Sequence, residues 1–219
     1  MKIELIIFDC DGVLVNSEPI SNKVFAQMLN EIKIKIDEEE TTQLFKGRSM
    51  ESCRQIVNSE FNKNISDSFL KEFRRRTNKI FAKELEPISG IQDVLNEINY
   101  PICVASSGSY KKMEFTLTKT GLRKYFETNI FSASEVKRGK PYPDIFLFAA
   151  KKMGVNPENC IVIEDSYTGV QAGLKAGMKV LYFNPQNIEK IKSENVNTFY
   201  KMDNLLNLIL QMKTNHQPD

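Results

Sequence analysis

Short runs of continuous apolar sequence constrain the fold of this chain more than any other feature. Such runs, rich in isoleucine and valine, occupy residues 3–8, 102–106, 129–132, 160–164 and 179–183. A strand with one face in water alternates apolar and polar residues, whereas a strand buried on both faces reads as an unbroken apolar run. The pattern therefore predicts a parallel sheet that is covered on both sides.

Helical patterns lie between these runs. They span Ser109–Thr120, Pro143–Met153 and Thr168–Ala176, and a glycine follows each of them directly. Glycine just past the last turn is a common helix stop. Strand and helix in alternation predict an α/β fold, namely a doubly wound parallel sheet.

One long interval breaks this alternation. About ninety residues separate the first two apolar runs, far more than one crossover helix needs, and most of this interval reads as helical. Asp37 and the three glutamates after it predict a helix start, because acidic side chains favour the positive end of a helix. We therefore expect residues 15–85 to form a helical domain inserted into a sheet domain of residues 1–14 and 86–212, with a flexible tail at 213–219.

Composition argues against several classes of function. The 219 residues are 41% hydrophobic and 26% charged, and the net charge is +2. This balance gives no case for nucleic acid or a membrane surface as a partner. No apolar run approaches a membrane span, the N-terminus shows no signal-peptide pattern, and the four cysteines form no CxxC pair. We expect a cytoplasmic protein that is a monomer or a weak dimer.

Polar groups follow four of the predicted strands at the point where each strand ends. They belong to Asp9, Asp11, Ser106, Ser107, Gly108, Lys140, Glu164 and Asp165. In an open α/β sheet the carboxyl ends of the strands meet at one edge, near the switch in strand order. These groups are therefore expected to converge on one pocket.

The carboxylates in this set fit a metal site and a nucleophile. Asp9, Glu164 and Asp165 supply clustered hard oxygen ligands, which suit Mg²⁺. A carboxylate also acts as a nucleophile and forms an aspartyl-phosphate. Asp11 lies two residues from Asp9, where it can pass a proton to a leaving oxygen.

The remaining groups fit a bound phosphate. Ser106 and the N–H groups of Ser107 and Gly108 lie where a helix begins, which is a natural phosphate cradle, and Lys140 supplies the positive charge that a phosphoryl group needs. Taken singly, a DxDG sequence is often a turn, a serine a helix cap and a lysine a solvated side chain. Their joint occurrence at four strand ends favours a site for phosphoryl transfer.

In this order the motifs resemble those of the haloacid dehalogenase-like hydrolase superfamily. DCDGV resembles its first motif, VASS its second, KRGKPYPD its third, and EDS with the following TGVQAGLKAGM its fourth. The resemblance implies a Rossmann-like core domain. It also implies that the inserted helical domain is a cap that closes over the site.

The resemblance also implies a role for each motif residue. Asp9 is the expected nucleophile and Asp11 the general acid and base. Ser106 is expected to hold the phosphoryl group, and Lys140 to bridge phosphate and nucleophile.

The implied cofactor is Mg²⁺. Its expected ligands are Asp9, the backbone carbonyl of Asp11, and Glu164 and Asp165 directly or through water. Because Asp11 has to carry a proton in the first step, its pKa is expected to be raised by burial and by charged neighbours.

Branches of this superfamily differ at recognisable positions. Dehalogenases lack the second aspartate and phosphonatases also depart there, so Asp11 argues against both. Sugar-phosphate mutases resemble this chain through FKGRS, but they commonly carry a histidine in the cap hinge, where this chain reads NSEPIS. The segments CVASSG, IFSASEVKRGKP and NVNTF are similar to a 6-phosphogluconate phosphatase-like group. We therefore expect a Mg²⁺-dependent phosphatase whose partner is a small phosphorylated metabolite, with 6-phosphogluconate as one candidate.

A mutase and an aspartyl-phosphate signalling module are the alternatives. Receiver modules also phosphorylate an aspartate at a strand end, but they are shorter and lack a helical insertion. Within the cap, Lys46 and Arg48 are the expected substrate contacts, since basic side chains on either side of Gly47 can meet a second anion. Basic residues in a last helical turn also simply suit the helix dipole.

Overall fold

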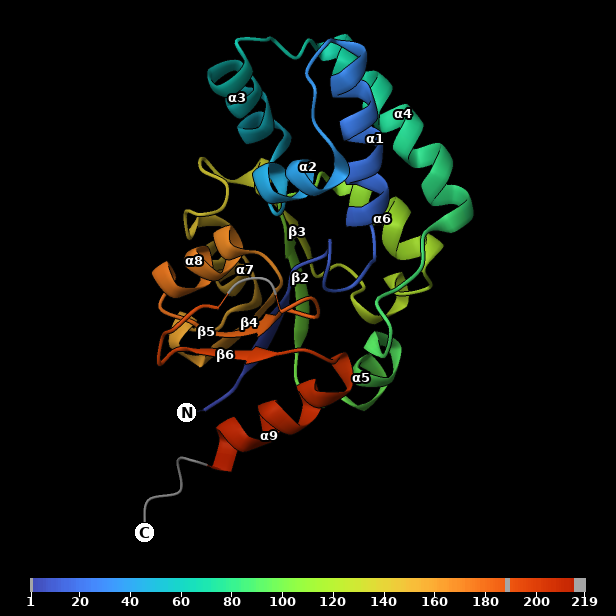
Figure 1. Ribbon diagram of the computed structural model, residues 1–219. Helices are drawn as coiled ribbons and strands as arrows, with labels where there is room; N and C mark the ends of the chain where they lie inside the picture. The colour runs from blue at the N-terminus through green and yellow to red at the C-terminus, as the bar shows by residue number, and fades with distance from the viewer. Residues whose placement is uncertain (1, 188–189, 215–219) are drawn as a thin grey trace.

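A six-stranded parallel sheet forms the centre of the molecule. The computed structural model describes residues 2–187 and 190–214. Within them the strand order is β3-β2-β1-β4-β5-β6, and every neighbouring pair is parallel (Figure 1). The strands are β1 (Leu5–Phe8), β2 (Ile102–Ser106), β3 (Ile130–Ser132), β4 (Cys160–Glu164), β5 (Lys179–Phe183) and β6 (Val196–Phe199). The predicted sheet is confirmed, and its order reverses at β1.

Both faces of the sheet are buried, which explains the unbroken apolar runs. Along β1, Ile6 and Phe8 pack into one apolar cluster and Leu5 and Ile7 into another, and all four are fully buried. Helices α5 (Ile91–Glu97), α6 (Tyr110–Lys119) and α9 (Leu205–Thr214) cover the first cluster, and α7 (Asp144–Met153) and α8 (Tyr167–Lys175) cover the second. Each such buried side chain contributes about 1.5–3 kcal/mol.

Four helices form a separate layer on one side of this sheet domain (Figure 1). They follow β1 directly and are α1 (Glu18–Glu31), α2 (Glu38–Phe45), α3 (Met50–Phe61) and α4 (Asp67–Glu84). They enclose an apolar cluster of their own, in which the Phe25 ring meets Phe45 and Phe73 edge-on at centroid distances of 5.0 and 5.3 Å. The predicted helical insertion after the first strand is confirmed.

Local hydrogen bonds fix the starts of α2 and α3. Asp37 and Glu40 form a capping box: the Asp37 carboxylate accepts from the Glu40 N–H at 2.8 Å, and the Glu40 carboxylate from the Asp37 N–H at 3.0 Å. Ser49 starts α3 by accepting from the Ser52 N–H at 3.2 Å. The Lys46 N–H donates to the Thr42 carbonyl at 3.0 Å at the end of α2, so the short connection from Lys46 to Arg48 is held on this side by α2 and on the other by the Ser49 cap.

Three elements lack a clear sequence signal. The sequence patterns predict neither α5 nor α9, and β6 reads VNTF and is half-exposed, so it gives no apolar run. Helix α9 extends to Thr214 and so includes the first two residues of the predicted tail; the rest of that prediction, residues 215–219, lies outside the described residues. In the described ranges, no helix is both long and apolar enough to cross a membrane.

Close packing of α8 on the sheet gives a first prediction. A Cβ added at Gly173 would lie 2.8 Å from Val180 Cγ2 on β5, so Gly173→Ala should lower the free energy of unfolding by about 1–3 kcal/mol. Urea unfolding measures this, with Lys175→Ala on the exposed end of the same helix as control. A variant as stable as the wild type would show that α8 lies further from the sheet.

Candidate functional site

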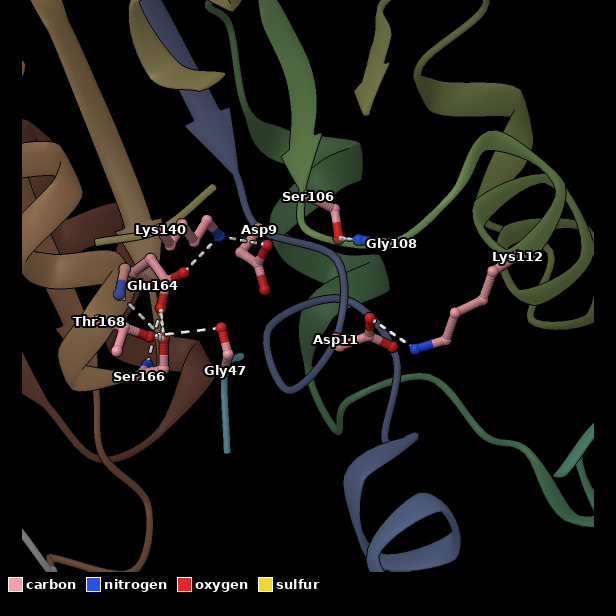
Figure 2. Close-up of polar contacts among 11 residues, drawn as sticks. Asp9, Asp11, Gly47, Ser106, Gly108, Lys112, Lys140, Glu164, Ser166 and Thr168 are labelled. Atoms are coloured by element: carbon pink, nitrogen blue, oxygen red, sulfur yellow. Dashed lines mark hydrogen bonds and ion pairs between the residues drawn. The ribbon is translucent and has the colours of Figure 1, made fainter. Parts of the chain in front are cut away.

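A buried lysine lies between two buried carboxylates at the carboxyl ends of β1 and β4. The Lys140 ammonium donates to Asp9 Oδ1 and to Glu164 Oε1, each at 2.6 Å (Figure 2). The three residues are at most 6% exposed, and the ammonium also lies 4.9 Å from the centre of the Phe146 ring. Removing charges from water is costly unless they are paired, so this arrangement depends on all three groups.

The charge state of Asp9 reflects this environment. Burial and the nearby carboxylates of Glu164, Asp165 and Asp11 together raise the pKa of Asp9 to about 8, although Lys140 acts in the opposite direction. One ammonium therefore does not compensate the negative charge gathered here. The pKa of Lys140 is raised, because its two carboxylate partners outweigh the effect of burial.

Glu164 is held on both of its oxygens. One accepts from Lys140, and the other accepts from the Ser166 N–H at 2.7 Å and the Ser166 hydroxyl at 2.9 Å. The carboxylate lies against α8 where Gly169 has no side chain: an added Cβ would lie 1.8 Å from Glu164 Oε1. Gly169 thus leaves the space that the Glu164 carboxylate occupies.

Asp165, the residue after Glu164, is a further carboxylate of the site. It is buried, and its Oδ2 lies 2.9 Å from the Lys46 ammonium, which is also 3.4 Å from Glu18 Oε2. Burial and the Glu18 carboxylate raise the pKa of Asp165. The loop after β1 approaches Asp165 so closely that a Cβ on Gly12 would lie 2.2 Å from its Oδ2, and Gly12 has a φ of +81°. Only glycine fits both constraints.

The loop after β2 presents a hydroxyl and backbone amides. Ser106 Oγ accepts from the Gly108 N–H at 3.0 Å (Figure 2), while the Gly108 carbonyl accepts from the Ser132 hydroxyl at 2.7 Å. Ser109 then caps α6. The Ser107 hydroxyl is buried and has no hydrogen-bond partner among the residues that the structure describes. The loop is thus shaped by its own hydrogen bonds, at the start of a helix, where an anion is favoured.

Asp11 does not face Asp9. Its carboxylate accepts from the Lys112 ammonium at 2.8 Å and from the Ser17 hydroxyl, and Figure 2 shows it turned toward Lys112. Burial raises the pKa of Asp11, but Lys112 and Ser17 outweigh burial and leave this pKa below its ordinary value. The predicted rise in the pKa of Asp11 is therefore wrong.

The cap reaches the site through the loop between α2 and α3. The Gly47 carbonyl accepts from the Thr168 hydroxyl at 3.3 Å (Figure 2), and Lys46 pairs with Asp165 as described. Arg48 is exposed. The structure thus brings Lys46 into the carboxylate cluster and leaves Arg48 at the surface beside it.

The sequence patterns missed several residues of this site. Lys112, Ser17 and Glu18 contact predicted site residues, and Thr168 binds the carbonyl of Gly47, which lies between the predicted Lys46 and Arg48. Lys112 had one signal: it lies in the first turn of α6, at the positive end of the helix, where a cation is disfavoured unless an anion is close. Ser17, Glu18 and Thr168 make their contacts only in the folded chain, so no local sequence pattern identifies them as site residues.

The net negative charge of the site favours the binding of a divalent cation. Five carboxylates face three ammonium groups in it, an excess of two negative charges when all are ionised; the groups belong to Asp9, Asp11, Glu18, Glu164, Asp165, Lys46, Lys112 and Lys140. In the part of the chain that the structure describes, no three His, Cys, Asp or Glu side chains are arranged to hold a metal by themselves. Mg²⁺ commonly uses only one or two carboxylates and keeps several waters, so this donor set fits it.

Known proteins resemble the chain over nearly its whole length. The sequence family described as haloacid dehalogenase-like hydrolase matches residues 6–183. A 6-phosphogluconate phosphatase of Escherichia coli (strain K12) is 37% identical over 207 residues, 93% of each chain. A solved haloacid dehalogenase-like protein of unknown function from Agrobacterium tumefaciens has a TM-score of 0.81 at 32% identity, over 96% of this chain and 99% of that one. A solved beta-phosphoglucomutase from Clostridium difficile has a TM-score of 0.79 at 28% identity, over 97% of each chain.

The pKa of Asp9 predicts how stability depends on pH. The folded chain keeps the Asp9 proton up to about pH 8, whereas the ordinary value is 3.8. Between these values the folded chain binds more protons than the unfolded chain, so the free energy of unfolding falls as pH rises. In the presence of EDTA, the margin by which the stability of Asp9→Asn exceeds or falls short of that of the wild type should shift in favour of the variant by about 1 kcal/mol per pH unit in this range. Urea unfolding at several pH values measures the margin, and a margin that is constant or shifts in favour of the wild type contradicts the assignment.

Proposed function

The chain belongs to the haloacid dehalogenase-like hydrolase family, and we propose that it is a Mg²⁺-dependent phosphatase of sugar phosphates, with 6-phosphogluconate as the leading candidate substrate. The observation that carries this proposal is the buried Lys140 ammonium between Asp9 and Glu164, beside a loop that presents a hydroxyl and amides. The 37% identity to a 6-phosphogluconate phosphatase supports the choice of substrate.

Asp9 is the proposed nucleophile. Its Oδ1 is bound to Lys140 at 2.6 Å, which leaves Oδ2 to attack phosphorus and form an aspartyl-phosphate. Lys140 holds the carboxylate in position and offsets the charge that develops on the phosphoryl oxygens. The Ser106 hydroxyl and the Ser107 N–H hold the phosphoryl group from the other side, and the Gly108 N–H joins them when it exchanges Ser106 Oγ for a phosphoryl oxygen.

Asp11 is the proposed proton carrier. It donates a proton to the leaving sugar oxygen and then takes one from the water that cleaves the aspartyl-phosphate. Its carboxylate is bound to Lys112 and Ser17. These partners also keep the pKa of Asp11 low, so proton transfer requires that Asp11 turn from them toward the phosphoryl group and take up a proton from solvent before it donates one.

The proposed cation ligands are the carboxylates of Asp9 and Asp165 and the backbone carbonyl of Asp11. Both oxygens of Glu164 already accept hydrogen bonds from Lys140 and Ser166, so Glu164 contributes through water. When bound, Mg²⁺ offsets the excess negative charge of the site and of the phosphoryl oxygens.

Residues 15–85 are proposed as the cap and residues 1–14 with 86–212 as the core. Lys46 and Arg48 then face the far end of the substrate, where 6-phosphogluconate carries its carboxylate. Lys46 lies in the site at 28% side-chain exposure, and Arg48 is the nearest further cation on the same loop. Fork-shaped guanidinium groups suit carboxylates.

A mutase is the second candidate, because a solved beta-phosphoglucomutase is similar to this chain over 97% of its length. Mutases of sugar phosphates and phosphatases share an aspartyl-phosphate and differ in what accepts the phosphoryl group. The product therefore separates them: a mutase gives an isomeric sugar phosphate, and a phosphatase gives free phosphate.

The substrate and the nucleophile are tested together. The purified chain with Mg²⁺ should release phosphate from 6-phosphogluconate faster than from glucose 6-phosphate, fructose 1-phosphate or β-glucose 1-phosphate. Asp9→Asn should lower kcat at least about a thousandfold and remain folded, whereas Asp93→Asn, on the exposed side of α5, should leave kcat unchanged. Substantial turnover by Asp9→Asn excludes Asp9 as nucleophile, and an isomer without free phosphate decides for the mutase.

Metal removal is a separate test. EDTA should abolish phosphate release, because the excess negative charge of the site would then repel the phosphate ester, and added Mg²⁺ should restore it. EDTA should also destabilise the wild type relative to a sample with Mg²⁺, and this difference should shrink in Asp165→Asn. An unchanged rate in EDTA contradicts the metal site.

A further inference from the structure

Lys112 has no part in the reaction as described so far, although it lies inside the site. Its ammonium is 2.8 Å from Asp11 Oδ2, and its side chain is 35% exposed, so a molecule that enters the site can reach it. It comes from the first turn of α6, directly after the Ser106 loop. A cation at this end of a helix is disfavoured by the helix dipole and depends on a nearby anion.

The aliphatic stem of the Lys112 side chain passes close to the end of β2 and the loop after it, where Ser106 and Gly108 lie. A Cβ added at Gly108 would lie 3.4 Å from Ser106 Oγ, 3.6 Å from Lys112 Cδ and 3.7 Å from Asp11 Oδ2. The loop hydroxyl, the lysine stem and the carboxylate therefore surround one small volume, and Figure 2 shows the three side chains around Gly108. A phosphoryl group held by Ser106 lies within reach of the Lys112 ammonium.

The Asp11 carboxylate and a phosphoryl group compete for the same cation. Both oxygens of Asp11 are engaged, one by Lys112 and one by Ser17. When Asp11 turns to the leaving oxygen, it leaves the Lys112 ammonium unpaired in a partly buried place. An unpaired ammonium there is costly, and a doubly charged phosphate is a stronger partner than a carboxylate.

We propose that Lys112 exchanges Asp11 for the phosphoryl group of the substrate, so that binding of a phosphate monoester releases Asp11 for proton transfer. This inference rests on the proposed phosphatase activity and adds a phosphate-binding residue to it. It also couples two events: phosphate weakens the Asp11–Lys112 pair, and by reciprocity the pair weakens phosphate binding.

Inorganic phosphate is the probe, and calorimetry in the presence of Mg²⁺ measures its affinity. Lys112→Met should weaken phosphate binding about tenfold or more, the usual effect of losing one charged hydrogen bond. Lys111→Met removes the same charge from the same helical turn, but Lys111 is exposed, so this control should bind phosphate as the wild type does. Circular dichroism and the thermal midpoint verify folding, and Lys112→Gln serves as a second neutral variant.

A double variant tests the coupling between the Asp11–Lys112 pair and phosphate binding. Asp11→Asn removes the competing carboxylate, so it should bind phosphate more tightly than the wild type. In the double variant D11N/K112M this gain should vanish, because the cation that was released is missing. If the gain survives in the double variant, it comes from the lost negative charge alone, and the exchange is refuted.

The remaining outcomes separate this inference from the proposed function. If the wild type binds phosphate and releases it from esters while both neutral Lys112 variants bind phosphate as tightly, Lys112 is only a fixed partner of Asp11. The inference then fails, and the phosphatase assignment stands. If the wild type neither binds phosphate nor releases it from any ester, the proposed function fails and the exchange fails with it.

Discussion

The Lys140 ammonium between Asp9 and Glu164 is the interaction on which the rest of this site depends. Two carboxylates at neighbouring strand ends repel each other and lose hydration when the fold closes around them, and the ammonium makes their burial tolerable. Several features serve this arrangement. Ser166 holds the second oxygen of Glu164, and Gly169 leaves space for its carboxylate. Even so, the pKa of Asp9 stays high, because burial disfavours its charged form and one cation is too few for the carboxylates gathered there.

The same shortage of positive charge connects the other parts of the molecule. Lys46 reaches from the cap to Asp165, and Lys112 reaches from α6 to Asp11, so two further carboxylates each take a lysine from a different element. A divalent cation and a phosphate ester bring charges of both signs into this network. Their binding therefore redistributes the existing ion pairs, and the cap loop and Asp11 are the parts that these pairs hold.

The sequence predicted the sheet and the motif residues because both have local signals. Unbroken apolar runs identify strands buried on two faces, and β1 shows why: Ile6 and Ile7 enter opposite clusters. Elements with weak local patterns, such as β6, were missed. So were Lys112 and Glu18, whose importance comes from contacts between distant segments. The pKa of Asp11 was predicted in the wrong direction for the same reason, since the partner that lowers it lies 101 residues away in the chain.

Covalent labelling of Asp9 tests the central claim most directly. The wild type is mixed with 6-phosphogluconate labelled in its phosphate, quenched in acid within milliseconds, and digested; borohydride reduction then marks any aspartyl-phosphate as homoserine. The account predicts transient label on the peptide that contains Asp9, with homoserine at that position alone. Release of phosphate without any labelled peptide, or label on another residue, would contradict it.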